Sequence, residues 1–447
     1  MSNALHIMRL IVYTPTVTAR VQYAWEVLLR YVLKIDYELV SNLDFYQSAD
    51  AYKINYSTQR QNNQEVFIPA GNLLFESGIR QQIIEILSTE NLPVFFQQTA
   101  SNADLPFDLP ALVFYLTTRY EEYLPYRQDA HRRFPAWESL AYREGFLQQP
   151  VVNQWACRLR TIMELRYPRI QMPRLIYRFQ PTYDVDMAWA YRYKGWKRNV
   201  LAGLKELLQG KFVDLEQRMQ VLSGKAEDPF FTFAYLDELH QQYQLQPIYF
   251  FLLGDYSAFD KNIPPQRPAL QELIQTLHRQ YPIGIHPSYR SDGQPQQIRR
   301  EVQRLKDATD DPVVRSRQHF LLLRFPQTYR NLLAAGITSD YTMGFAVETG
   351  FRASIATAYP WYDLENEMIT PLMIHPFQAM DVTLKNYLQL SPQAAFEKVQ
   401  GLIEAIKSVG GTFSTIWHNS SLSTVDGWQD WKEMYEKMVK MALSNQD

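Results

Sequence analysis

The stretch "LIYRFQPTYDVDM" (residues 175–187) joins an apolar run to two carboxylates that stand two positions apart, Asp184 and Asp186. The run "LIYRF" (175–179) predicts a β-strand. Side chains alternate along a strand, so the two carboxylates would share one side if the strand continued through them. They would then repel each other unless a cation, a proton or water separated them. Alternatively, both residues lie in a solvated loop as turn formers or helix caps.

Further apolar runs follow this first one, separated by segments with helical spacing. Residues 270–277 carry apolar side chains on one helical face, and a second helix is predicted from Ser391 to Gly410. Continuous apolar strands that alternate with helices predict an α/β fold with a mostly parallel sheet, and we expect a barrel of β/α units. The predicted strands are "PIYFFLL" (247–253), "YPIGIH" (281–286), "HFLLLRF" (319–325), "ITPLMIH" (369–375) and "GTFSTIWH" (411–418).

The domain organisation follows from chain length and from a proline-punctuated segment. A chain of 447 residues exceeds what one hydrophobic core usually serves, and "RYPRIQMPR" (166–174) is typical of a linker. Before it, a strand at 9–15 and an amphipathic helix at 19–33 predict a smaller α/β domain, residues 1–170, of unknown role. The barrel is expected over residues 175–447. Residues 125–134 predict a solvated, salt-bridged loop rather than a catalytic Asp–His pair.

Composition excludes several classes of partner. The net charge is -2 and no basic stripe is present, so we expect no nucleic-acid partner. No apolar stretch approaches the roughly 18 residues of a membrane span. The lack of a signal pattern in the first residues and the single cysteine, Cys157, fit a cytoplasmic protein. Nothing in the sequence indicates the oligomeric state.

Polar residues fall at the ends of the predicted strands. In β/α barrels the carboxyl ends of the strands form the active-site face, so residues far apart in sequence meet there. A single histidine at a strand end would be a structural residue, but several of them together with Asp-x-Asp form the ligand set of a catalytic divalent metal. The pattern therefore favours a metal-assisted hydrolase. These residues are Asp184, Asp186, His286, His319, His375 and His418.

The order of these motifs resembles the polysaccharide deacetylases of the NodB-homology type, which are similar to carbohydrate esterase family 4, over residues 175–425. The segment "RYEEYLPYRQDAHRRF" (119–134) also resembles an uncharacterised domain that often precedes such deacetylases in bacteria. The matching motifs are "TYDVD" (182–186), "IGIHPSYRS" (283–291), "VRSRQHFLLLRFPQTY" (314–329), "AGITSDYTMGF" (335–345), "GFRAS" (350–354) and "TIWHNSS" (415–421).

The resemblance implies a divalent metal, with zinc expected, held by Asp186 and His286. The family's second motif has another histidine four residues after the first, and here that position is Arg290. An arginine has no lone pair to donate, so we expect His319 to be the third ligand, while Ser291 is a poorer candidate. The alternatives are that His319 is a packed residue, or that the metal is lost.

The resemblance also implies the catalytic roles. Asp184 would be the general base and His418 the general acid, and Arg315 or Arg317 would orient Asp184 through charge-assisted hydrogen bonds. The implied reaction removes N-acetyl or O-acetyl groups from a sugar or polysaccharide precursor. The alternative is a catalytically silent carbohydrate-binding or scaffold protein that keeps the barrel but not the metal.

Overall fold

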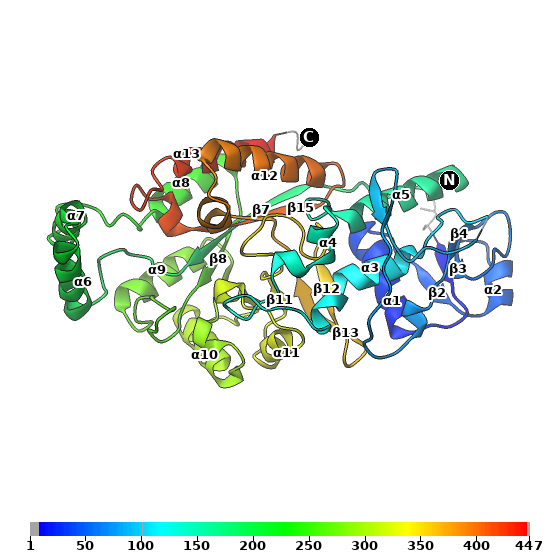
Figure 1. The fold of residues 1–447 in the computed structure, drawn as a ribbon, viewed down its shortest axis with the longest axis horizontal. Helices are drawn as coiled ribbons and strands as arrows, with labels where there is room; N and C mark the ends of the chain where they lie inside the picture. The colour runs from blue at the N-terminus through cyan, green and yellow to red at the C-terminus, as the bar shows by residue number, and fades with distance from the viewer. Residues whose placement is uncertain (1–8, 101, 445–447) are drawn as a thin grey trace, which may run out of the picture.

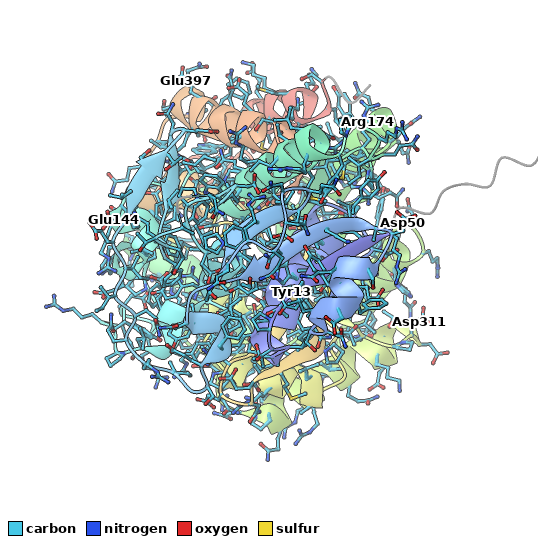
Figure 2. All side chains as sticks on the ribbon, turned by 90° about the vertical axis from the view of Figure 1, so that its right-hand side faces the viewer. Tyr13, Asp50, Glu144, Arg174, Asp311 and Glu397 are labelled. Atoms are coloured by element: carbon cyan, nitrogen blue, oxygen red, sulfur yellow. The ribbon has the colours of Figure 1, made fainter. Side chains whose placement is uncertain are left out.

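The computed structural model describes residues 9–100 and 102–444. Its amino-terminal part contains a parallel four-stranded sheet in the order β2-β1-β3-β4, and Figure 2 looks onto this end of the molecule, with Tyr13 of β1 near the centre. A small antiparallel pair, β5 and β6, lies apart from it. The strands are β1 (Leu10–Tyr13), β2 (Glu38–Val40), β3 (Tyr52–Ser57), β4 (Val66–Pro69), β5 (Leu87–Thr89) and β6 (Leu92–Val94).

A second sheet of nine strands forms the larger part, in the order β12-β13-β11-β10-β9-β8-β7-β15-β14. Eight of these strands run parallel and β12 pairs antiparallel with β13, which confirms a mixed α/β fold with parallel sheets. Among the residues described, no ladder joins the end strands β12 and β14, so closure into a barrel stays a prediction. The strands are β7 (Arg178–Val185), β8 (Ile248–Phe251), β9 (Ile283–Ile285), β10 (Arg315–Ser316), β11 (Ser339–Asp340), β12 (Tyr359–Asp363), β13 (Met368–Ile374), β14 (Ala379–Met380) and β15 (Thr412–His418).

Helices pack around both sheets, and Figure 1 shows α8, α12 and α13 on one side of the nine-stranded sheet and α9, α10 and α11 on the other. The amino-terminal helices are α1 (Ala19–Trp25), η1 (Glu26–Val32), α2 (Leu43–Ser48), η2 (Leu73–Phe75), α3 (Leu109–Thr117), η3 (Tyr120–Tyr123), η4 (Ala136–Glu138), α4 (Leu140–Arg143) and α5 (Val151–Arg166). The later ones are α6 (Trp196–Leu208), α7 (Phe212–Leu222), α8 (Phe233–Tyr243), α9 (Pro268–His278), η5 (Tyr289–Ser291), α10 (Pro295–Thr309), η6 (His319–Leu321), α11 (Gln327–Ala334), η7 (Thr383–Tyr387), α12 (Pro392–Lys407), η8 (Asn419–Leu422) and α13 (Trp431–Leu443).

Two predicted strands differ from the observed ones. The first begins later than predicted and continues to Val185, so Asp184 lies within β7. The prediction of a strand at 319–325 is wrong, because the strand of this segment is the short β10, and His319 opens the 3-10 turn η6. Phe320 and Leu321 have φ values of 57° and 53°, a left-handed conformation that turns the chain and that an extended strand cannot contain.

Ion pairs join the amino-terminal part to the nine-stranded part. The Nη2 atom of Arg352 lies 2.6 Å from Oε2 of Glu122, and both side chains are almost fully buried. Buried Arg20 also pairs across this boundary with Glu367, whose side chain is partly exposed. Independent domains at 1–170 and 175–447 stay a prediction, and residues 1–8 lie outside the part that the structure describes. No helix within residues 9–100 and 102–444 is both long and apolar enough to cross a bilayer.

Candidate active site

Asp184 lies inside β7, buried between neighbouring strands. Its Oδ1 atom accepts a hydrogen bond from Nη1 of Arg317 at 2.8 Å, and Arg317 is fully buried. The other candidate partner, Arg315, lies near Tyr341 and His375 instead. The structure thus brings Asp184 together with Arg317, which follows β10 directly.

Three predicted ligands meet just beyond the end of β7. The ligand atoms of Asp186, His286 and His319 all lie within 4.8 Å of one another, and within the described residues this is the one group of its kind. Nε2 of His286 is 3.3 Å from Oδ1 of Asp186, and Nε2 of His319 is 3.6 Å from its Oδ2. This cluster could hold a metal ion.

The two histidines of this cluster are oriented by acceptors on their far sides. Nδ1 of His286 lies 2.6 Å from the carbonyl oxygen of Arg317, and Nδ1 of His319 lies 2.9 Å from Oδ1 of Asp260. Because a carbonyl or a carboxylate only accepts, each Nδ1 carries the proton. In the neutral ring the Nε2 lone pair then points toward Asp186, as in histidines that bind metals.

The charges of the cluster fit a cation. The Oδ1 atom of Asp186 is buried and has no hydrogen-bond partner among the described residues, although the rest of the side chain is partly exposed. Burial alone would raise the pKa of Asp186, but His319, His286 and His418 lower it well below its usual range. Burial would lower the pKa of His319, whereas Asp186 and Asp260 raise it to about 9. The carboxylate therefore attracts positive charge, and protons and a metal would compete for these atoms.

His418 faces the same carboxylate from the end of β15. Its Nε2 is 3.7 Å from Oδ2 of Asp186, and its Nδ1 lies 2.9 Å from Oδ1 of Asp381. Asp381 also accepts the backbone N–H of His418 at 2.7 Å. Burial lowers the pKa of His418, but Asp381, Asp186 and Asp184 raise it to about 10. Sequence reasoning missed Asp381; it follows β14 directly, but two residues make too short an apolar run to predict a strand.

Asp260 is the second residue that sequence reasoning missed. It holds the backbone of the loop at Tyr289 and Arg290, where the sequence departs from the deacetylase motif. Besides His319, it accepts the backbone N–H groups of Tyr289 at 2.7 Å and of Arg290 at 3.3 Å. Arg290 itself is exposed, and the hydroxyl of Ser291 donates to the carbonyl of Ser288 at 2.7 Å. The backbone of Arg290 and the hydroxyl of Ser291 are therefore engaged in hydrogen bonds at this loop.

A loop of the amino-terminal part reaches the turn beside His319. The ion pair predicted for residues 125–134 is present, with Nε of Arg133 2.7 Å from Oδ2 of Asp129. The solvated character predicted for this loop is wrong at Arg133, which is buried and donates to the carbonyl of Phe320 at 2.6 Å. The ring of His131 lies 4.9 Å from that of Phe320. The loop thus supports the backbone that presents His319.

His375 is the predicted strand-end histidine that the structure keeps apart from the cluster. Its ring stacks on Tyr341 with the ring centres 4.3 Å apart and an interplanar angle of 7°. Burial and the nearby Arg315 lower the pKa of His375 to about 4. His375 therefore serves as a packed residue, the alternative considered for any single histidine.

A family model matches the amino-terminal part of the chain. A model of a family of unknown function, DUF7033, matches residues 10–168, which include the segment 119–134. No match was found among curated proteins.

Several solved structures are similar to the chain at low sequence identity. A candidate polysaccharide deacetylase from Mycobacterium smegmatis has a TM-score of 0.40 at 14% identity, over 62% of this chain and 88% of that one. A 4-alpha-glucanotransferase from Thermococcus litoralis has a TM-score of 0.35 at 11% identity, over 62% of this chain and 39% of that one. A GH138 enzyme targeting pectin rhamnogalacturonan II has a TM-score of 0.26 at 11% identity, over 97% of this chain and 64% of that one.

Proposed function

We propose that this chain is a metal-dependent hydrolase that removes N-acetyl or O-acetyl groups from a sugar or polysaccharide precursor, with a deacetylase-type β/α barrel over residues 175–447. In this proposal Asp186, His286 and His319 hold a divalent cation, expected to be zinc. Asp184, oriented by Arg317, is the general base, and His418, oriented by Asp381, is the general acid.

One observation carries the proposal: a carboxylate and an imidazole flank the three-ligand cluster, and each has its own orienting partner. Oδ2 of Asp184 lies 3.7 Å from Nε2 of His286, while Arg317 occupies Oδ1. Nε2 of His418 faces Oδ2 of Asp186. A silent sugar-binding protein would need neither the buried arginine nor the buried Asp381 behind these two groups.

The chemistry divides among these residues. A cation held by the cluster would polarise an acyl carbonyl and make water easier to deprotonate. Asp184 accepts the proton of the attacking water at Oδ2, because the fixed Arg317 guanidinium already engages Oδ1. His418 gives the proton on Nε2 to the departing amine, which cannot leave as an anion, and Asp381 holds the imidazole in the orientation for that transfer.

The proposal is tested by metal analysis together with acetate release from N-acetylglucosamine oligomers. We expect purified protein to contain zinc, to lose acetate release on chelation and to regain it when zinc is returned. Asp311→Asn, at an exposed carboxylate that pairs with His278, is a control that should behave as wild type. Zinc-loaded protein that releases no acetate from N-acetylated or O-acetylated sugars would reject the hydrolase and favour the silent sugar-binding alternative.

A further inference from the structure

The helices α6 and α7 form a hairpin that stands away from the rest of the molecule. Figure 1 shows it at the end opposite the four-stranded sheet. The hairpin belongs to the connection between β7, which leads into Asp186, and β8. Connections that leave the carboxyl ends of parallel strands lie at the same edge of the sheet, and Asp186 follows the carboxyl end of β7. The hairpin therefore projects from the same edge of the sheet as the cluster.

Polar contacts fix the two helices of the hairpin to each other. Arg218 of α7 is buried, and it donates to Asn199 at 2.8 Å and to Glu206 at 2.9 Å, both on α6. Gly203 lies on the same row of α6 and is also buried; a Cβ there would lie 3.4 Å from Leu215. These contacts assign one face of α6 to α7.

The neighbouring face of α6 has no partner within the described chain. Trp196, Val200, Leu204 and Leu207 follow helical spacing, and all four are exposed. Residues 193–222 hold 11 of the 25 exposed large apolar side chains found among the described residues, including Leu208 at 83%, Val213 at 79% and Trp196 at 72%. At the base, Trp196 and Val200 line an open pocket of about 420 Å³ together with Leu222 and Arg267.

The charge of the hairpin differs in sign from that of the whole chain. From the first residue of α6 to the last of α7, residues 196–222 contain five Lys or Arg and three Asp or Glu, a net charge of +2 in a chain of net charge -2. Lys197, Lys205 and Lys211 are exposed beside the apolar face. A helix with large apolar side chains on one face and lysines along its flank is suited to lie in the interface of an anionic bilayer.

We propose that the α6–α7 hairpin docks this protein onto an anionic lipid surface. Exposed apolar side chains where α6 ends and α7 begins, such as Leu208 and Phe212, enter the interface between headgroups and acyl chains. The lysines face the lipid phosphates. The occupant is a membrane surface because the apolar face and the local positive charge coincide, and an anionic bilayer complements both. This docking is independent of the hydrolase chemistry proposed above.

Co-sedimentation of the full chain with vesicles tests the proposal. We expect binding to phosphatidylcholine vesicles that contain roughly one third phosphatidylglycerol, much weaker binding to phosphatidylcholine alone, and weakening by salt. Leu208→Ser with Phe212→Ser should reduce the partition coefficient by about 100-fold, given the transfer free energy of the buried groups. The matched control is Ile83→Ser with Leu165→Ser, two exposed apolar residues outside the hairpin, which should bind as wild type.

A charge variant keeps the test independent of apolar packing. Lys205→Glu with Lys211→Glu should reduce binding by about 10-fold or more, whereas Lys306→Glu with Lys437→Glu, the same charge change elsewhere, should have little effect. Wild-type protein that ignores anionic vesicles, or hairpin variants that bind as wild type, would overturn the proposal. So would a concentration-dependent dimer that Leu208→Ser with Phe212→Ser abolishes, because a second copy would then be the occupant.

Discussion

Two carboxylates, Asp108 in the amino-terminal part and Asp186 beside the nine-stranded sheet, differ in how their oxygens are used. Asp108 caps α3 and accepts hydrogen bonds from Ala111 N–H, Gly71 N–H and the hydroxyl of Tyr56, all at 2.6 to 3.0 Å. Asp186 keeps a buried oxygen without a hydrogen bond in the described structure. A buried carboxylate whose hydrogen bonds are complete stabilises the fold, whereas one left open beside imidazole lone pairs indicates a binding site.

The largest effect is expected for Asp184→Asn. An amide still accepts the hydrogen bond from Arg317 but cannot take a proton from water, so acetate release should fall by at least about 100-fold. Zinc content should stay near that of wild type. The assay compares turnover and metal content of the purified variant, and a stably folded variant with normal turnover would remove Asp184 as the base.

Next is His418→Ala, which should affect amides more than activated esters. A poor amine leaving group needs the proton, whereas a nitrophenolate does not, so the loss on the amide should exceed the loss on nitrophenyl acetate by about 10-fold or more. His375→Ala is the matched control, since that histidine stacks on Tyr341 away from the cluster. Equal losses on both substrates would contradict the role of general acid.

His319→Ala examines the third ligand directly. Zinc titration into the metal-free variant should show an affinity weakened by at least about 10- to 100-fold. That is the loss typical of mutating a residue that only hydrogen-bonds to a metal ligand. Ser291→Ala should keep the affinity of wild type, because its hydroxyl is bound to Ser288. The ligand assignment is wrong if the Ser291 variant loses the metal and the His319 variant keeps it.

Asp108→Ala should lower the stability of the fold and preserve activity, the reverse of the effects expected for the variants at the site. Removing the carboxylate leaves the buried hydroxyl of Tyr56 unpaired and α3 without its cap, a loss of about 2 to 3 kcal/mol in the free energy of unfolding. Urea unfolding measures the loss, and kcat of the folded variant should match wild type. A large fall in kcat without a change in stability would break the comparison between the two carboxylates.

The smallest effect concerns His240, a buried histidine whose Nδ1 has no partner among the described residues. Burial lowers its pKa to about 3, so the unfolded chain binds a proton that the folded chain does not. Stability should therefore fall as pH drops below about 6.5, by about 1 kcal/mol between pH 7 and 5.5. In His240→Gln this part of the pH dependence should vanish. Urea unfolding at the two pH values measures this change. The prediction is contradicted if His240→Gln loses as much free energy of unfolding between pH 7 and 5.5 as wild type does.

The sequence predicted those strands of the parallel sheet that are apolar runs with clear boundaries, but not the two-residue strands β10, β11 and β14. The strands at 247–253, 369–375 and 411–418 are confirmed within a few residues, and Ser391 caps the predicted helix. The strand at 319–325 failed because an apolar run alone does not distinguish a strand from the left-handed turn at Phe320 and Leu321.

The site was only partly predictable for a similar reason. Asp186, His286 and His319 could be chosen by residue type and position, whereas Asp260 and Asp381 act through contacts that no local pattern encodes. Arg315 and Arg317 were equivalent in sequence. Only the register of β10 beside β9 determines that Arg317 reaches Asp184. The metal and the catalytic roles stay predictions.

The buried ion pair between Glu122 and Arg352 affects how the protein unfolds. Each residue comes from a different side of the linker at 166–174, so a chain cut there would leave a buried guanidinium without its carboxylate, at a cost of about 3 to 5 kcal/mol. We therefore expect the two sheets to unfold in one cooperative transition rather than as separate modules. An engineer who wants only the part with the nine-stranded sheet would have to rebuild the surface around Arg352 first.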